Sequence, residues 1–73
     1  MTTFKIIEKI IKENNDVVVN KTSNIKNDLN LDSLDLVEKL LTIEEYFMIE
    51  ISDEDLIKLE TIEDIVSKVD ELK

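Results

Sequence analysis

The side chains available for chemistry in this sequence are carboxylates, ammonium groups and hydroxyls, because the chain contains no histidine and no cysteine. The Ser/His/Asp and Cys/His arrangements of nucleophilic catalysis and thiolate metal sites are therefore excluded. The absence of glycine likewise excludes a glycine-rich phosphate-binding loop. One hydroxyl is of special interest, that of Ser33, which lies between Asp32 and Asp35 in the stretch LNLDSLDLVEKLLTIEEYF, residues 29–47. Ser33 is either an ordinary helix cap or a point of covalent attachment.

The acidic side chains are numerous, but their spacing does not indicate a catalytic or metal site. Asp53, Glu54 and Asp55 are consecutive, whereas a calcium loop needs a glycine bend and spaced oxygen ligands. General acid–base catalysis by paired carboxylates needs a pocket that shifts their pKa values, and no sequence feature indicates one. We therefore expect a protein that is not an enzyme and that binds no metal.

The charge is unevenly distributed along the chain. The net charge is −9, with a balance of +2 over residues 1–26 and of −11 over residues 27–73. Such a surface repels nucleic acid and anionic membranes and attracts basic protein surfaces. Keeping a small protein in solution would also account for the charge.

The length and the apolar pattern predict one soluble, cytoplasmic domain, residues 1–73. No stretch approaches the roughly 20 apolar residues of a membrane span. The N-terminal residues do not resemble a signal peptide.

The chain lacks both glycine and proline. Small strand-rich folds depend on these residues for tight turns, so we expect helices to position the polar side chains. Apolar spacing predicts an all-α fold, a small four-helix bundle with three longer helices, a short third helix and a long first connection. The first helix follows a cap at Thr2 or Thr3 and ends near Asn14 and Asn15. Its buried face contains Phe4, Ile7, Ile10 and Ile11.

The connection to the second helix is predicted to be extended, with Val17, Val18 and Val19 packing on the core above Ile25 and Leu29. Two further helix starts are indicated by capping signals. Ser52 with Asp55 predicts a short helix to about Lys58. Thr61 with Asp64 opens a last helix that buries Ile62, Ile65, Val66 and Val69.

The second helix is predicted from Ser33 to about Met48 and has two apolar faces. Its core stripe comprises Leu36, Leu40, Ile43 and Phe47. An adjoining set, which we expect to be partly exposed among acidic residues, comprises Leu34, Val37 and Leu41.

The tripeptide Asp32-Ser33-Leu34, preceded by Asp28-Leu29 and followed by an acidic amphipathic helix, resembles the acyl carrier proteins. The resemblance continues through ISDEDLIKLETIEDIV, residues 51–66, and covers nearly the whole chain. It implies a four-helix bundle whose serine carries a 4′-phosphopantetheine arm, which a phosphopantetheinyl transferase attaches from coenzyme A. It favours attachment over the capping role that Ser33 would have on cap preferences alone.

The resemblance also assigns roles to other residues. Asp32 and Leu34 flank the attachment site, and the second helix is the recognition helix for basic patches on acyl transferases, synthases and the transferase. The implied partner contacts are Asp32, Leu34, Asp35, Val37, Glu38, Leu41, Glu44 and Glu45. The implied walls of an acyl-chain pocket are Leu36, Leu40, Ile43, Ile62 and Ile65, for which ordinary core packing is the alternative.

Four positions depart from the pattern of the family. Asn30 replaces a glycine and would take a positive φ angle, Leu31 replaces a small residue beside the serine, and Ser52 replaces a proline. Lys39 replaces a leucine, and we expect its stem to pack while its ammonium reaches solvent. These departures leave partner choice and acyl cargo open.

The sequence predicts a monomeric carrier of acyl groups in fatty-acid or polyketide-type biosynthesis. Two alternatives stay open. One is a peptidyl, aryl or D-alanyl carrier, which would share the modified serine. The other is an unmodified acidic helical adaptor that binds a basic partner.

Overall fold

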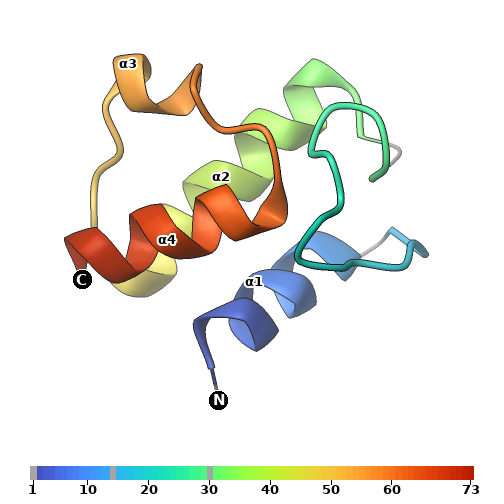
Figure 1. Ribbon diagram of the computed structural model, residues 1–73, viewed down its shortest axis with the longest axis horizontal. Helices are drawn as coiled ribbons and strands as arrows, with labels where there is room; N and C mark the ends of the chain where they lie inside the picture. Colours follow the sequence, from blue (N-terminus) through green and yellow to red (C-terminus); the bar gives the residue numbers. More distant parts are fainter. Residues whose placement is uncertain (1, 14, 30) are drawn as a thin grey trace.

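The computed structural model describes residues 2–13, 15–29 and 31–73. Its helices are α1 (Thr3–Lys12), α2 (Ser33–Phe47), α3 (Asp53–Leu56) and α4 (Ile62–Leu72). Figure 1 shows α1 beside α2 and α4, with the short α3 in the connection that joins α2 to α4. The predicted fold class, an all-α bundle of three longer helices and one short helix, is confirmed. The described residues contain no β-strand, only an isolated bridge between Asn24 and Thr61.

Each helix begins at a polar side chain that accepts a hydrogen bond from the backbone three residues on. The predicted caps at Thr2, Ser52 and Thr61 are confirmed, with oxygen–nitrogen distances of 3.2, 3.3 and 3.2 Å. Thr61 and Asp64 form a complete capping box, because the carboxylate of Asp64 also accepts from the Thr61 N–H at 3.0 Å. These local contacts account for where the helices start.

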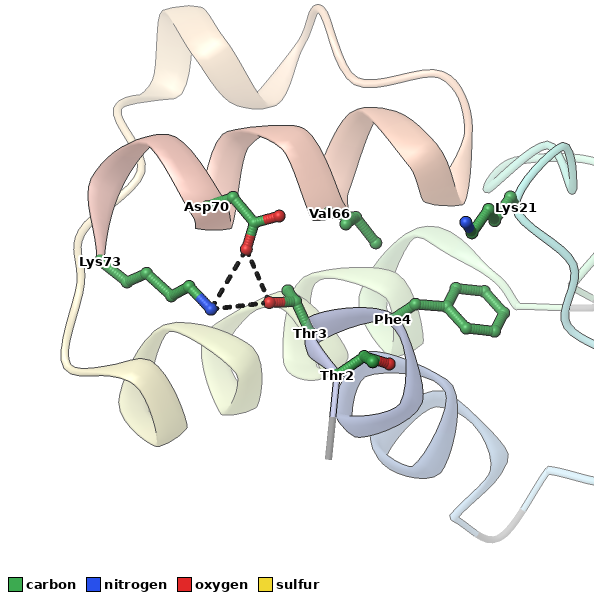
Figure 2. A pocket seen from close by; sticks show the side chains of 7 residues that line it. All are labelled: Thr2, Thr3, Phe4, Lys21, Val66, Asp70 and Lys73. Carbon is green, nitrogen blue, oxygen red and sulfur yellow. Dashed lines mark hydrogen bonds and ion pairs between the residues drawn. The ribbon is translucent and has the colours of Figure 1, made fainter.

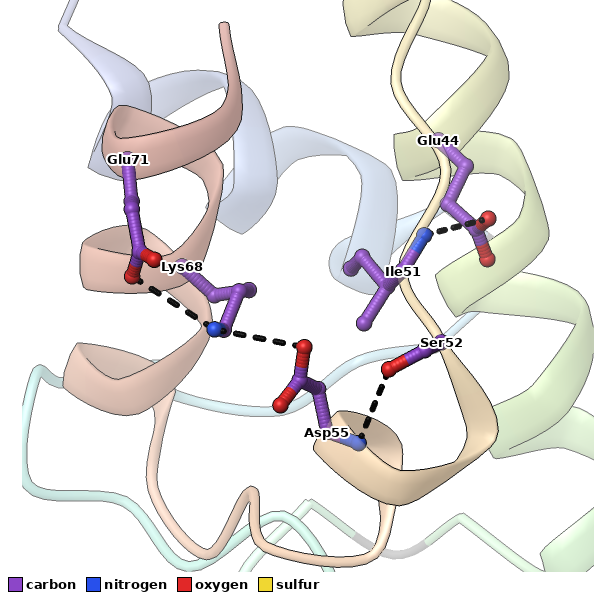
Figure 3. A network of polar contacts seen from close by, with 6 residues as sticks. All are labelled: Glu44, Ile51, Ser52, Asp55, Lys68 and Glu71. Atoms are coloured by element: carbon purple, nitrogen blue, oxygen red, sulfur yellow. Dashed lines mark hydrogen bonds and ion pairs between the residues drawn. The ribbon is translucent and has the colours of Figure 1, made fainter.

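The third helix is shorter than predicted. It ends at Leu56 rather than near Lys58, and none of its residues is buried. The carboxylate of Asp55 does not complete a capping box with Ser52 but lies 3.4 Å from the ammonium of Lys68 in α4, which also contacts Glu71 at 3.4 Å (Figure 3). The turn of α3 is therefore connected to α4 by an ion pair, while Leu56 packs partly buried against the core.

The second helix ends at Phe47, close to the predicted end near Met48, and its C-cap Met48 is in the left-handed conformation. Met48 has φ 57° and ψ 46°, and Ile49 donates its N–H to the Glu44 carbonyl at 3.0 Å. Glycine usually takes this conformation, and a side chain there costs about 1–2 kcal/mol. Helix α1 ends at Lys12 with Glu13 as its C-cap, close to the end predicted near Asn14 and Asn15. The prediction that Asn30 has a positive φ angle concerns a residue outside those described.

The core lies where α1, α2 and α4 meet. Its buried apolar residues include Ile7, Ile10, Ile11, Leu40, Ile43, Ile62, Ile65 and Val69 from the helices, and Val19, Ile25 and Leu29 from the first connection. Phe4 and Val66 are only partly buried at its edge. The prediction for Val18 is wrong, since this side chain is 75% exposed. Alternation explains the difference, because successive residues of extended backbone point to opposite sides.

The first connection is held along the start of α4 by backbone hydrogen bonds. Ile25 donates its N–H to the Glu60 carbonyl at 2.9 Å, and Ile62 donates to the Ser23 carbonyl at 3.1 Å. Because Ile25 is also buried, this part of the connection has a fixed position beside the start of α4. Such pairing between distant segments left no periodic signal in the sequence.

The two ends of the chain are joined by a polar contact over a cavity of about 530 Å³ (Figure 2). The Thr3 hydroxyl donates to Asp70 at 2.6 Å, and the Lys73 ammonium donates to the Thr3 oxygen at 2.9 Å. Lys73 also lies 3.2 Å from Asp70 and 5.9 Å from the ring centre of Phe47. These contacts close the bundle at the end away from the start of α2.

None of the helices in the described ranges combines the length and the apolar character needed to cross a lipid bilayer.

Candidate functional site

Ser33 is the first residue of α2, but it is not the residue that caps this helix. The cap is Asp32, whose carboxylate accepts from the Asp35 N–H at 2.8 Å. Ser33 is exposed, and its hydroxyl makes no hydrogen bond among those of the described residues. The interpretation of Ser33 as an ordinary N-cap is therefore wrong, and its oxygen is accessible to another molecule.

The position of Ser33 also favours negative charge. The N-terminal turn of a helix carries unpaired backbone N–H groups and the positive end of the helix dipole, which together stabilise an anion by about 0.3–1 kcal/mol. Since α2 has 15 residues, its dipole is well developed. A phosphodiester on the Ser33 oxygen would lie in this field.

A shallow cavity of about 300 Å³ adjoins Ser33. Its lining consists of Lys26 and Leu31 from the connection, and Asp32, Ser33, Leu36 and Val37 from the start of α2. It thus combines one hydroxyl, one ammonium group, one carboxylate and three apolar side chains. This set of groups fits a phosphodiester followed by a partly apolar arm, the chemistry of phosphopantetheine.

The predicted apolar partner contacts lie together on the outer face of α2. Leu34, Val37 and Leu41 are 67%, 51% and 52% exposed. They are spaced three and four residues apart, so they form one stripe along the helix. Exposed acids border this stripe, namely Asp35, Glu38 and Glu45. We call these six residues the α2 outer face.

Glu44 differs from the other acids predicted to bind partners. Its side chain is half-buried, and its carboxylate accepts from the Ile51 N–H at 3.1 Å (Figure 3). This contact fixes the chain that leaves α2. The structure thus gives Glu44 a structural contact and places it outside the α2 outer face.

The residues predicted to line an acyl-chain pocket lie in the core. Leu40, Ile43, Ile62 and Ile65 are buried and packed in one cluster, with Leu36 at its edge. Leu36 also lines the cavity beside Ser33, and the other four do not. These four side chains are close-packed here, as the alternative of ordinary core packing predicts.

Lys39 connects α2 to the end of α1. Its ammonium donates to the carbonyl of Glu13, the C-cap of α1, at 2.6 Å. A cation at a helix C-terminus is favourable because that end carries partial negative charge. The position of Lys39 in the sequence gave no indication of this contact, which joins residues 26 positions apart.

Lys26 was not among the predicted site residues. It precedes Ser33 by seven positions in a loop, where no periodic pattern indicates which way a side chain points. Leu31 was noted only as a departure from the family pattern. Both are brought to Ser33 by the fixed course of the connection.

Residues 4–69 match the family model described as "Phosphopantetheine attachment site". An acyl carrier protein of Campylobacter jejuni (strain RM1221) is 42% identical to this chain, and the alignment covers 100% of this chain and 99% of the relative. An acyl carrier protein of Helicobacter hepaticus is 38% identical over 96% of both chains. The solved structure of the acyl carrier protein from Enterococcus faecalis superposes with a TM-score of 0.78, at 35% identity and with both chains fully covered.

Proposed function

Because this chain belongs to the acyl carrier protein family, we propose that Ser33 bears its 4′-phosphopantetheine arm and that the arm carries acyl groups as thioesters. Proteins of this family are carriers and not enzymes. The observation that supports Ser33 is its accessible hydroxyl, which takes no part in capping α2 and lies inside the matched region. When bound, the arm supplies a terminal thiol, a group that this chain lacks.

Ser33 would be the nucleophile of the attachment step. Its oxygen bonds to the phosphorus that bears pantetheine, the phosphoanhydride bond of coenzyme A breaks, and adenosine 3′,5′-bisphosphate leaves. The hydroxyl proton passes to a base of the transferase, since this chain has no histidine to accept it. The chain itself contributes the exposed oxygen and the field of the α2 N-terminus.

The α2 outer face would be the docking surface for the transferase and for acyl transferases and synthases. Leu34, Val37 and Leu41 offer apolar area, where burying one side chain contributes about 1.5–3 kcal/mol. The bordering acids would pair with basic patches on the partner and raise the association rate. The density of acids on α2 favours partners of fatty-acid or polyketide-type synthesis over those of peptidyl carriers.

We also propose that residues 1–73 act as one domain and as a monomer, because a net charge of −9 opposes association between copies. The cytoplasm is the proposed compartment, since coenzyme A supplies the arm there.

The acyl class can be tested on the modified protein. The protein carrying the arm is incubated either with a fatty acid, ATP and an acyl–carrier ligase, or with an amino acid, ATP and a loading enzyme of peptidyl carriers. We expect a mass increase only with the fatty acid, and neutral hydroxylamine should reverse it by cleaving the thioester. Loading by the amino acid alone, or by neither substrate, would contradict the proposed acyl class.

A further inference from the structure

The cavity beside Ser33 has a chemically mixed lining. Lys26 is the only cation among its residues, while Leu31, Leu36 and Val37 provide apolar surface. Asp32 also lines the cavity, but its carboxylate is engaged with the Asp35 N–H at 2.8 Å. The cavity therefore offers one cation and three apolar side chains beside one hydroxyl.

Lys26 is carried on a fixed turn. The side-chain oxygen of Asn24 accepts from the N–H groups of Lys26 and Asn27 at 2.9 and 3.0 Å. The carboxylate of Asp28 accepts from the Asn24 N–H at 2.8 Å, and Asp28 donates its own N–H to the Asn24 carbonyl at 2.9 Å. The neighbouring Ile25 is buried. Because the backbone is held on both sides, the lysine stem starts from a defined place.

The ammonium of Lys26 takes part in no ion pair within the described part of the chain. The lysines that do so are Lys5, Lys68 and Lys73. Residues 27–73 carry a net charge of −11, so most charged side chains in this part of the sequence are acidic. Lys26 places a positive charge beside Ser33. An anion placed on the Ser33 oxygen would meet this cation as well as the carboxylate of Asp32, which lines the same cavity.

We propose that Lys26 is a positioning residue, which pairs with the phosphodiester on Ser33 and directs the arm over Leu31, Leu36 and Val37. This inference rests on the proposed attachment at Ser33. A phosphodiester keeps one negative charge at neutral pH, so a hydrogen bond from an ammonium to it is charge-assisted. The apolar methyl groups of the pantoyl part would then cover apolar side chains that otherwise face water.

The proposed arrangement has a consequence for docking. Val37 belongs both to the cavity and to the α2 outer face, so an arm held in the cavity covers part of the docking surface. A partner that binds this face would displace the arm from Val37 and receive it in extended form. Lys26 would therefore bias the carrier toward a resting position of the arm.

The test compares amide chemical shifts of the protein before and after attachment of the arm, with intact mass as the check on loading. In the wild-type protein, attachment should shift the amides of Lys26, Leu31, Leu36 and Val37. Lys26→Met should reduce the shifts at the last three several-fold, and Lys26→Arg should retain them because it keeps the charge. Lys21→Met is the matched control, since it removes the same charge from the same connection at the opposite cavity.

The outcomes separate the two proposals. One outcome is that every variant gains the mass of the arm except Ser33→Ala, while Lys26→Met gives the same amide shifts as wild type. Attachment at Ser33 then stands, and the role of Lys26 is overturned. If the wild-type protein gains no mass at Ser33, the proposed function fails and the inference fails with it. Equal losses in Lys26→Met and Lys21→Met would show a general charge effect and would also overturn the role of Lys26.

Discussion

The carboxylate of Asp32 accepts a hydrogen bond from the backbone N–H of Asp35 at 2.8 Å, and this contact separates the cap of α2 from its reactive residue. The two adjacent polar side chains thus have different tasks. Asp32 satisfies an N–H group of the first turn, and Ser33 remains exposed. An attachment residue that also capped the helix would lose the cap on modification.

This division predicts different stability effects for the two neighbours. Asp32→Ala should lower the free energy of unfolding by about 1 kcal/mol, the usual cost of losing an N-cap. Ser33→Ala should change it by less than about 0.5 kcal/mol, because an exposed side chain without a hydrogen bond is removed. Urea denaturation followed by circular dichroism measures both. A loss in Ser33→Ala as large as that in Asp32→Ala would contradict the assignment of the cap.

The capping box of α4 predicts a pH-dependent contribution to stability. Hydrogen bonds from the Glu60 and Thr61 N–H groups lower the pKa of Asp64 below its ordinary value of 3.8. A carboxyl whose pKa is lower in the folded state stabilises the fold above the ordinary pKa, and this stabilisation is lost as the pH falls through the lowered value. Asp64→Ala should therefore be less stable than wild type at pH 7, by about 1 kcal/mol.

The difference between Asp64→Ala and wild type should shrink as the pH falls below 3.8, the ordinary aspartate pKa. Urea titrations over this range measure it. Glu63→Ala is the control, because it removes an exposed acid from the same helical turn and leaves both capping hydrogen bonds in place. If the difference in free energy of unfolding between wild type and Asp64→Ala is constant with pH, the charge of the Asp64 carboxylate does not contribute to the stability that the capping box provides.

The contact of Lys68 with Asp55 predicts local control of α3. Lys68→Met should increase amide hydrogen exchange in α3, because no residue of this turn is buried and the ion pair connects it to α4. The global free energy of unfolding should change little, since ion pairs near the surface contribute little to stability. Lys12→Met, on the exposed end of α1, is the control. Unchanged exchange in α3 would show that the ion pair does not hold it.

The α2 outer face predicts a salt-dependent encounter with the transferase. Glu38→Lys should slow attachment of the arm mainly through the association rate, and the wild-type rate should fall as salt screens the acids. Glu71→Lys makes the same charge change at the far end of α4 and should have a smaller effect. Intact-mass measurements on samples quenched at successive times give the attachment rates for this comparison. If both reversals slow attachment equally, only the net charge matters and α2 has no special part.

Local features of the fold were predictable from the sequence, and contacts between distant segments were not. The bounds of α2 follow from apolar spacing, and the start of α4 follows from the Thr61 and Asp64 pair, because both signals lie within a few residues. The shared polar contact of Thr3, Asp70 and Lys73 joins opposite ends of the chain. Its components are common residues without a pattern, so only the folded chain reveals it.

The same distinction applies to the site. Exposure of Leu34, Val37 and Leu41 follows from the helical period. Cap preferences alone could not distinguish Ser33 from Asp32 as the cap, because serine and aspartate cap helices about equally well and are adjacent here. Lys26 was missed because its position depends on hydrogen bonds of the connection to Asn24 and to the start of α4.

The central claim is covalent attachment at Ser33, and intact-mass spectrometry tests it most directly. The protein without its arm is incubated with coenzyme A and a phosphopantetheinyl transferase of broad specificity. The mass should rise by about 340 Da, one phosphopantetheine, and Ser33→Ala should abolish the rise. The chain offers internal alternatives in Ser23, Ser52 and Ser67. A full mass increase in Ser33→Ala, or a modified peptide that contains one of these serines, would contradict the claim.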